Sequence, residues 1–310
     1  MELIRGWHNL RERHRGCVAT IGNFDGVHRG HQVILKHLAE EAARRSLPAT
    51  LILFEPQPLE FFRPDIAPPR LTSLRDKVAL LRELGLTRVL CLRFNRLLAQ
   101  MEPERFIEEI LVQRLGLRYL LVGDDFRFGR KRRGDFAMLQ RAGAEQGFEV
   151  ACTPTVTDAT GERISSTRVR QALAEGDLST ATALLGHPYR ISGRVRRGQA
   201  LGRDLGFPTA NIGFGGLQPA ANGIFVVRVH GLDAPRPGVA SIGTRPTVNG
   251  VEPLLEVHLL DFEGQLYGRT LSVEFLQWLR AEERFESVEA MQRQIARDAD
   301  RAREFFAAVE

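Results

Sequence analysis

The chain has 310 residues, which is long for a single domain and favours two. Hydrophobic residues make up 43% and charged residues 26%, a balance that is ordinary for a globular protein in water. No apolar run reaches the roughly 18–20 residues that span a bilayer, and the first residues contain no apolar targeting segment, so the sequence excludes a membrane-spanning protein and predicts a cytoplasmic one.

The formal net charge is +5, and nearly all the basic residues are arginines. Such a mild positive charge suits phosphorylated small molecules or weak contacts with nucleic acid. Three cysteines stand far apart, inside or beside apolar runs: Cys17, Cys91 and Cys152. This spacing predicts buried, reduced, structural thiols instead of disulfides or zinc ligands.

Short apolar runs alternate with segments of helical periodicity from residue 17 to about residue 185. The predicted strands are Cys17–Ile21, Thr50–Phe54, Arg88–Leu92, Tyr119–Gly123 and Phe148–Thr153. The predicted helices are Gln32–Arg45, Leu74–Leu84, Pro103–Leu115 and Asp135–Gln146. This alternation predicts an α/β domain with a doubly wound, mostly parallel sheet and helices on both faces.

The first strand runs into a glycine-bearing loop and the start of a helix, Gly22-Asn23-Phe24-Asp25-Gly26-Val27-His28-Arg29-Gly30-His31. Ligands bind at such a point of an open α/β sheet, because free backbone N–H groups and the helix dipole favour an anion. His28 and His31 are three residues apart, so both imidazoles face the same way on a helix. This HxGH sequence resembles the signature of the nucleotidyltransferase superfamily, which implies transfer of an α-phosphoryl group with release of pyrophosphate. A structural histidine pair or an incidental metal site is the alternative for these four residues alone.

Three further segments follow predicted strands or open a helix. Phe54-Glu55-Pro56-Gln57-Pro58 follows the second strand, and Asp124, Asp125, Phe126 and Arg127 follow the fourth, so both lie at the same sheet edge as His28. The segment from Asp124 to Arg127 is expected to contact a base, a ribose or a metal, unless it is only a polar turn. Ile164-Ser165-Ser166-Thr167-Arg168 opens a helix with Ser165 or Ser166 as its N-cap, and Arg168 suits the outer phosphates of ATP. A capped helix with solvated arginines is the alternative for this last segment.

The character of the chain changes after His187-Pro188, where glycine, proline and short β-rich runs become dense. The predicted strands here are Tyr189–Val195, Ile224–Val229, Val239–Ile242, Leu254–Leu260 and Leu271–Phe275. They predict a small antiparallel β-barrel, closed by a C-terminal helix from Ser287 onward. The predicted domains are therefore residues 1–186 and 187–310.

The second half also carries groups suited to phosphate chemistry. Thr209 and Asn211 alternate on an extended segment and face the same way, and their neutral oxygens are ligands that Mg²⁺ with bound phosphates accepts. A glycine-bearing loop that can fold over phosphates precedes them and includes Gly193, Arg194, Gly198 and Gly202. Glu256 alternates with His258 and Leu260 on a predicted strand, so it is either a functional carboxylate or an outward-facing surface residue.

Several motifs stand in order along the chain. They are Gly22–Gln32, Val122–Gly129, Arg163–Arg170, Leu184–Pro188, Pro208–Asn211, Ile242–Thr247, Glu256–Phe262 and Leu266–Gly268. Together they resemble the bacterial bifunctional riboflavin kinase/FMN adenylyltransferase family, the FAD synthetases, over essentially the whole chain.

The resemblance implies two reactions. Domain 187–310 phosphorylates riboflavin with ATP and Mg²⁺ to give FMN, with Glu256 as the general base and Thr209 and Asn211 holding Mg²⁺ and phosphate. The loop from Gly193 to Gly202 is expected to contact this ATP. Domain 1–186 joins FMN to the AMP part of a second ATP, giving FAD and pyrophosphate.

In the adenylyl transfer, the resemblance assigns stabilisation of the transferred group to His28 and His31. The other residues expected to contact ATP are Gly22, Phe24, Asp25, Gly26, Ile164, Ser165, Ser166 and Arg168. The flavin or the nucleotide is expected to meet Asp124, Asp125, Phe126 and Arg127. FMN attacks with an anionic phosphate, so this step depends on positioning, whereas riboflavin attacks with a neutral alcohol that benefits from a carboxylate.

Three alternatives stay open from the sequence. One of the two activities is lost and its domain serves as a scaffold; the chain is a basic nucleic-acid-binding protein that uses Arg127 to Arg133; or it is similar to a class I aminoacyl-tRNA synthetase. No membrane partner and no specific nucleic acid are expected, and the sequence leaves the oligomeric state open.

Overall fold

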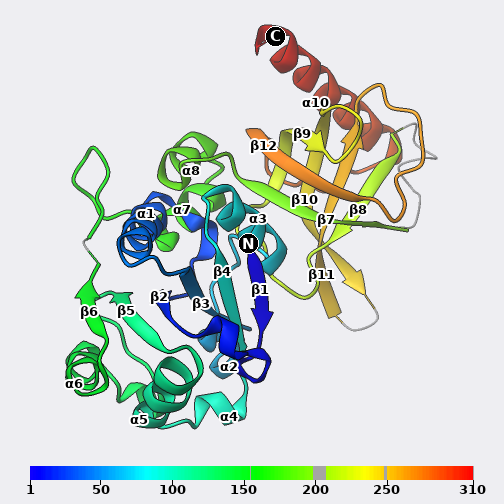
Figure 1. Cartoon of the computed structure of the whole chain (residues 1–310). Helices are drawn as coiled ribbons and strands as arrows, with labels where there is room; N and C mark the ends of the chain where they lie inside the picture. The colour runs from blue at the N-terminus through cyan, green and yellow to red at the C-terminus, as the bar shows by residue number, and fades with distance from the viewer. Residues whose placement is uncertain (154, 198–206, 248–249, 310) are drawn as a thin grey trace. The chain divides into compact units, whose positions relative to one another are not determined.

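The structure is a computed structural model that describes residues 1–153, 155–197, 207–247 and 250–309 (Figure 1). The chain forms two compact units. The first consists of Met1–Ala67 and Lys77–Ile164, and the second of Pro68–Asp76 and Ser165–Glu310. In the part of the chain that is described, no helix is both long and apolar enough to cross a membrane.

The first unit is built on a six-stranded sheet with the order β1-β4-β3-β2-β5-β6, in which every pair is parallel. Its strands are β1 (Glu2–Arg5), β2 (Cys17–Ile21), β3 (Ala49–Glu55), β4 (Arg88–Arg93), β5 (Leu117–Val122) and β6 (Glu149–Cys152). Every residue of β2 is buried, because a central parallel strand is covered on both faces. The predicted α/β class is confirmed, and β1 is an additional edge strand in which only Ile4 is buried.

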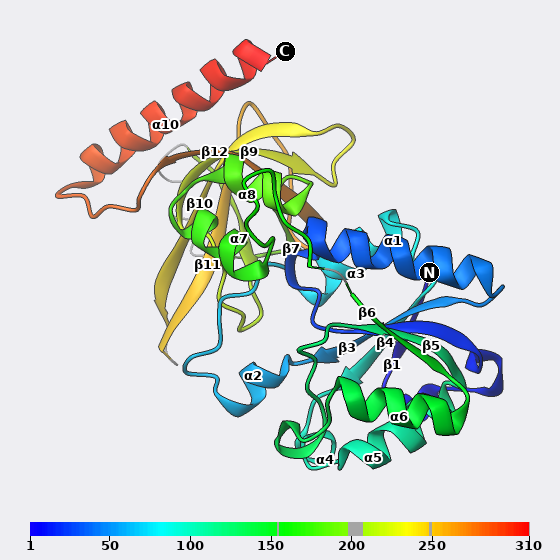
Figure 2. The ribbon, with the colours of Figure 1, turned by 90° about the vertical axis from the view of Figure 1, so that its left-hand side faces the viewer.

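Helices cover both faces of this sheet (Figure 2). They are α1 (Arg29–Arg44), α2 (Pro58–Phe62), α3 (Leu74–Glu83), α4 (Arg96–Ala99), α5 (Pro103–Arg105), its π-helical continuation η4 (Phe106–Arg114) and α6 (Phe136–Gln146), with 3₁₀ turns η1 (Trp7–Asn9), η2 (Glu12–His14), η3 (Asp25–Val27) and η5 (Arg130–Arg132). Figure 2 shows α1 on one face and α5 and α6 on the other. The chain leaves β2 for β3 on one side and later enters β5 on the other, so the strand order reverses between β2 and β5. Ligands bind at such a switch point in doubly wound sheets.

Local capping fixes where these helices begin and end. The side chain of Asp135 accepts a hydrogen bond from the Met138 amide, and α6 ends at Gly147 with a left-handed φ of 78°. Asn95 caps α4 in the same way, accepting from the Leu98 amide at 3.0 Å. Helix α1 begins three residues before its predicted start, because its N-cap is His28, an uncommon capping residue.

Two of the three cysteines are buried as predicted, but the prediction for Cys152 is wrong. Cys17 and Cys91 are buried, whereas Cys152 is exposed at the end of the edge strand β6. Burial raises the pKa of the Cys17 thiol to about 11, so this thiol stays protonated at neutral pH.

The second unit contains helices on either side in sequence of a closed antiparallel barrel with the strand order β10-β11-β8-β7-β12-β9. Its elements are α7 (Ser166–Ala174), α8 (Leu178–Leu185), β7 (Arg190–Arg196), β8 (Thr209–Gly213), β9 (Gly223–His230), β10 (Arg236–Thr247), β11 (Gly250–Leu259), β12 (Thr270–Arg280) and α10 (Val288–Val309). The predicted barrel with a C-terminal helix is confirmed, and α10 packs on β10 and β9.

One prediction for this unit is wrong. Gly193 and Arg194 lie within strand β7 and not in a loop over phosphates. A Cβ atom at Gly193 would overlap the side chain of Ile212, so this glycine serves packing of the barrel. Gly198 and Gly202 lie outside the described residues.

A salt bridge fastens α10 to the end of β12. Asp298 has an exposed fraction of 1%, and its carboxylate accepts hydrogen bonds from the guanidinium of Arg280 at 2.8–3.2 Å and from Gln294 Nε2 at 3.1 Å. Removing one partner of such a pair leaves the other charge poorly solvated, which costs more than the pair itself contributes.

Replacing Asp298 with alanine is therefore expected to destabilise the second unit by about 2–3 kcal/mol, near the low end for buried ion pairs because Arg280 keeps some exposure. Amide hydrogen exchange in β9 measures the change. Asp300→Ala is the control, because Asp300 pairs with Arg303 on the exposed face of α10 and should cost under about 0.5 kcal/mol. An equal loss of stability in Asp298→Ala and Asp300→Ala would contradict the prediction.

Candidate active sites

The HxGH segment forms a compact cap at the N-terminus of α1. Nδ1 of His28 accepts a hydrogen bond from the His31 amide at 3.3 Å. The two imidazoles stack with ring centroids 3.6 Å apart, and the ring of Phe24 stacks on His31 at 4.5 Å. The predicted common orientation of the two histidines is confirmed.

Glycine at position 30 is required by this stack. A Cβ atom there would lie 3.1 Å from the His28 ring and 3.5 Å from the carbonyl oxygen of Ile164. The absence of a side chain at position 30 therefore leaves room for the His28 ring.

The loop before His28 has an unusual backbone. Phe24, Gly26 and Val27 have φ values of 46°, 82° and 43°. Only the glycine adopts the left-handed region without strain, and a β-branched residue such as Val27 is a genuine outlier there, at a cost of about 1–3 kcal/mol. The predicted ATP residue Asp25 is buried within this strained loop.

A buried lysine supports the same loop. Lys77 on α3 has no exposed surface, and its ammonium donates to the carbonyl oxygen of Asn23 at 2.5 Å. Burial lowers the pKa of His31 well below its usual range, and the neighbouring His28 and the Lys77 ammonium act in the same direction. His31 is therefore neutral at pH 7. Its Nδ1 is buried and hydrogen-bonds to no residue that the structure describes.

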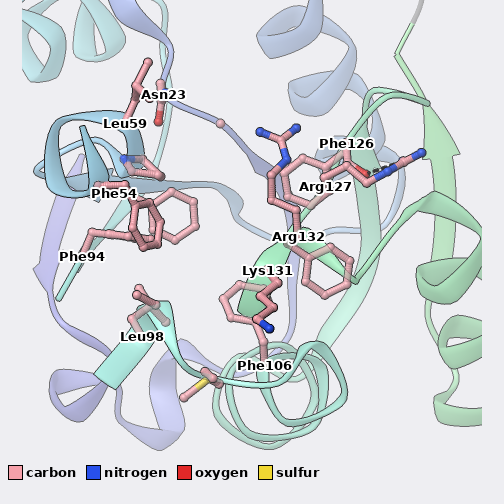
Figure 3. Close-up of a pocket in the computed structure, with 17 residues that line it drawn as sticks. Asn23, Phe54, Leu59, Phe94, Leu98, Phe106, Phe126, Arg127, Lys131 and Arg132 are labelled. Atoms are coloured by element: carbon pink, nitrogen blue, oxygen red, sulfur yellow. Dashed lines mark hydrogen bonds between the residues drawn. The ribbon is translucent and has the colours of Figure 1, made fainter. Parts of the chain in front are cut away.

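A cavity of 530 Å³ lies at the carboxyl edge of the sheet (Figure 3). Its wall combines residues that come from the ends of four different strands. They are Gly22 and Asn23 after β2, Phe54 at the end of β3, Phe94 after β4, and Phe126 to Gly129 with Lys131 and Arg132 after β5. Leu59, Phe62, Leu98, Met101 and Phe106 complete an apolar wall. Its charged lining residues, within the described part of the chain, are Arg127, Lys131 and Arg132. The predicted position of Phe54 and Phe126 at one edge with the HxGH loop is confirmed.

Sequence reasoning selected only part of this wall. Phe126 and Arg127 line the cavity, whereas Asp124 and Asp125 are exposed and do not. Phe94, Phe106, Lys131 and Arg132 were missed, because no local motif marks them and only the strand order brings them together.

The predicted second phosphate segment opens α7. Ser165 is the N-cap, and its hydroxyl accepts from the Arg168 amide at 3.4 Å. Ile164 ends the first unit, while Ser165, Ser166 and Arg168 belong to the second. Joint action of this segment and the two histidines on one ATP therefore stays a prediction.

The second cavity, of 320 Å³, lies on the outer face of the barrel beside α10. Thr209 on β8 and Glu256 and His258 on β11 line it, and Ser241, Arg280, Glu282, Glu283 and Asp298 supply its other polar groups. Its apolar wall consists of Phe207, Ile224, Val239, Phe285, Met291 and Ile295.

Strand register explains why these polar groups share one face. Asn211 pairs with Glu256 and Thr209 pairs with His258 across β8 and β11. Directly opposed residues project to the same side of a sheet, so all four face outward while the intervening Ala210 and Val257 fill the barrel. Oδ1 of Asn211 is buried and accepts no hydrogen bond from any described residue.

The imidazole of His258 is held at the edge of this cavity. It lies 3.1 Å from the Pro208 carbonyl oxygen and packs edge-on against Phe207. Burial lowers the pKa of His258, although the Pro208 carbonyl opposes the shift. Among the described residues, no three histidine, cysteine, aspartate or glutamate side chains converge to hold a metal ion by themselves.

The fold and the two cavities provide two separate candidate centres, one on the α/β unit and one on the barrel. Two family models match the chain: FAD synthetase over residues 10–168 and riboflavin kinase over residues 185–306. The chain belongs to the bifunctional riboflavin kinase/FMN adenylyltransferase family. It phosphorylates riboflavin with ATP to FMN and adenylylates FMN with ATP to FAD.

Named relatives are similar over nearly the full length. The bifunctional riboflavin kinase/FMN adenylyltransferase of Escherichia coli strain K12 is 53% identical over 308 residues, covering 99% of this chain and 98% of that protein. The protein of the same name from Pseudomonas fluorescens is 52% identical over 304 residues, covering 98% and 97%. A crystal structure from Streptococcus pneumoniae, described as a macrolide-efflux protein, matches with a TM-score of 0.80 and 28% identity over 98% of this chain and 99% of that one.

The lowered pKa of His31 makes the stability of the first unit depend on pH. Below pH about 6.5 the unfolded chain binds a proton at this position and the folded chain does not, so stability falls as the pH falls. When the pH is lowered from 7.5 to 5.5, the free energy of unfolding of the wild-type first unit is expected to fall by about 1 kcal/mol more than that of His31→Gln. Amide exchange of β2 at the two pH values measures this, with the exposed His8→Gln as control. A pH dependence that His31→Gln leaves unchanged would contradict it.

Proposed function

We propose that the HxGH cap of α1 carries the adenylyl transfer and that the aromatic cavity beside it holds the flavin ring of FMN. The supporting observation is one cavity of 530 Å³ whose wall is apolar and aromatic and whose rim includes the loop that leads to His28. An isoalloxazine ring is flat and aromatic, so it gains most from stacking and from burial against such a wall. Gly22, Phe24, Asp25, Gly26 and Ile164 are proposed to shape the ATP site.

In this proposal the reaction is a displacement at the α-phosphorus of ATP. An oxygen of the FMN phosphate forms a bond to this phosphorus, and the bond to the bridging oxygen breaks, so that pyrophosphate leaves with the electron pair. His28 and the neutral His31 donate N–H groups to the α-phosphoryl oxygens as charge develops. Ser165, Ser166 and Arg168 hold the outer phosphates.

For the first reaction we propose that riboflavin occupies the barrel cavity and that Glu256 accepts the proton of its ribityl hydroxyl. Glu256 and the apolar side chains of Phe207 and Phe285 line the same 320 Å³ space, which supports placing a flavin and a base together. The hydroxyl oxygen attacks the γ-phosphorus of ATP, and ADP leaves.

Thr209 and Asn211 are proposed to hold Mg²⁺ together with ATP. The residues fit this role, because Thr209 supplies a hydroxyl at the cavity and Asn211 a buried amide oxygen that accepts from no described group. When bound, Mg²⁺ offsets negative charge on the phosphates. The residues themselves orient the nucleotide toward Glu256.

We further propose that residues 1–186 carry the adenylyl transfer and residues 187–310 the kinase reaction, in the cytoplasm where ATP is abundant. A specific nucleic-acid partner is not proposed. Of the basic run from Arg127 to Arg133, Arg130 and Arg133 pair with Glu102, which weakens its fit to a phosphate backbone.

The division of labour is tested with two substitutions. His28→Asn keeps a capping side chain but removes the imidazole, and is expected to lower FAD formation from supplied FMN about 100-fold while FMN formation from riboflavin stays unchanged. Glu256→Gln is expected to lower FMN formation at least about 100-fold and leave the adenylylation of FMN intact. Chromatographic separation of riboflavin, FMN and FAD measures both reactions.

Two exposed residues provide matched controls for these variants: His8→Asn in the first unit and Glu252→Gln on β11. Both should behave as wild type. Loss of both reactions in a folded single variant would refute the proposed assignment of residues.

The role of Asn211 predicts an altered metal requirement. Asn211→Ala is expected to raise the Mg²⁺ concentration for half-maximal riboflavin phosphorylation at least about tenfold. The Mg²⁺ dependence of adenylyl transfer in the same protein is the internal control, and urea unfolding verifies that the barrel is intact. An unchanged Mg²⁺ dependence of the kinase reaction would remove Asn211 from the metal site.

A further inference from the structure

The turn from Gly129 to Arg132 has a backbone that its side chains do not favour. Gly129, Lys131 and Arg132 have φ values of 69°, 53° and 58°. Long side chains rarely adopt the left-handed region, and two neighbouring ones must be held there by their surroundings. Such outliers cluster at ligand-binding segments, where the strain places a side chain that an ordinary turn would direct elsewhere.

Contacts at both ends hold this turn in place. A Cβ atom at Gly129 would lie 2.8 Å from Pro103, so only glycine fits there. The Arg130 amide donates to the Met101 carbonyl at 2.8 Å, and Phe128 and Gly134 exchange two backbone hydrogen bonds at 3.0 and 3.1 Å. The ring of Phe128 also packs directly on Gly134. The turn is therefore clamped onto the wall of the aromatic cavity.

The four consecutive basic residues of this turn separate into two pairs. Arg130 and Arg133 each bind a different oxygen of Glu102, at 3.1 and 3.2 Å. Lys131 and Arg132 instead line the cavity, and neither forms an ion pair with any residue that the structure describes. The outer two charges are thus neutralised by Glu102, and the inner two are left for a ligand in the cavity.

The two cavity-lining cations extend to different places. In Figure 3 the guanidinium of Arg132 reaches toward the edge of the cavity that Asn23 lines, whereas the ammonium of Lys131 lies beside Phe106. Asn23 belongs to the loop that leads from β2 to His28. Arg132 therefore extends toward the side of the cavity that is formed by the same loop as the HxGH cap. An apolar aromatic cavity with a cation at this edge suits a ligand that is flat at one end and anionic at the other.

We infer that Arg132 binds the phosphate of FMN and makes this cavity selective for FMN over flavins that lack a phosphate. The inference rests on the proposed placement of the flavin ring in this cavity. A guanidinium suits the task, because its planar donors bind two phosphate oxygens at once and it keeps its charge at any physiological pH. It also offsets the repulsion between the FMN phosphate and the phosphates of ATP as the two anions approach.

The test compares Arg132→Gln with Arg133→Gln, a matched substitution on the same turn whose charge is already paired with Glu102. Arg132→Gln is expected to raise KM for FMN in FAD formation at least about tenfold, the loss of one charge-assisted contact, with KM for ATP changed less than about twofold. Arg133→Gln should leave both constants within about twofold of wild type.

Lumiflavin, an isoalloxazine without a ribityl phosphate, separates phosphate binding from packing. Its inhibition constant against FMN should stay within about twofold in Arg132→Gln, because this probe has no group for the guanidinium to bind. Arg132→Lys should restore part of the lost affinity for FMN, since the charge returns without the paired donors.

Two results with Arg132→Gln would overturn the inference. A rise in KM for ATP without one for FMN would place the guanidinium on the nucleotide phosphates. A parallel loss of lumiflavin and FMN binding in Arg132→Gln would mean that Arg132 only shapes the wall. Failure of lumiflavin to compete with FMN in wild type would instead reject the placement of the flavin ring, and the inference with it.

Discussion

All six strands of the first sheet run in the same direction, and this constraint brings distant parts of the chain to one edge. The loops after β2, β3, β4 and β5 begin at positions as far apart as Gly22 and Gly123, yet each starts where its strand ends on that edge. The reversal of strand order between β2 and β5 then leaves room between two of these loops. The aromatic cavity is a consequence of this arrangement, because its wall needs several of these loops, and the loop that carries the HxGH cap is one of them.

In the barrel the corresponding constraint is the alternation of side chains along paired strands. Ala210, Ile212, Leu255 and Val257 fill the interior, which obliges Thr209, Asn211, Glu256 and His258 to face outward. An outward carboxylate would ordinarily be solvated. Here α10 and the residues around Phe285 form the opposite wall of a cavity, so the polar face of a strand pair becomes the floor of a site. The Arg280–Asp298 pair fastens that wall, which connects the stability of α10 to the shape of the cavity.

The sequence predicted the parts of the molecule that depend on local signals. Strand β2 could be bounded to the residue because a central parallel strand is apolar on both faces, and α6 because an aspartate cap precedes it and a glycine ends it. The start of α1 was misplaced because histidine is rarely a cap, and Cys152 was taken as buried because an edge strand carries the same apolar pattern as a covered one.

The site could be predicted only where a motif marked it. His28, His31 and Glu256 stand in recognisable sequences, and Phe126 and Arg127 follow a strand. Phe94 and Phe106 are ordinary apolar residues until the strand order brings them into one wall. Nothing local predicts that Lys131 and Arg132 adopt positive φ, because lysine and arginine do not favour it; the fixed ends of the turn impose that conformation.

The two centres solve opposite electrostatic problems, and their residues differ accordingly. Riboflavin brings a neutral alcohol to ATP, so a kinase site must create negative charge on the nucleophile, which is the role proposed for the carboxylate of Glu256. FMN brings an anion that is already nucleophilic, so a further carboxylate would only add repulsion. Among the residues that the structure describes, the aromatic cavity is lined by three basic side chains and no acidic one, and the acidic pair Asp124 and Asp125 is exposed outside it. In the proposed adenylyl-transfer site, exclusion of negative charge around the anionic nucleophile therefore complements the role proposed for the histidines.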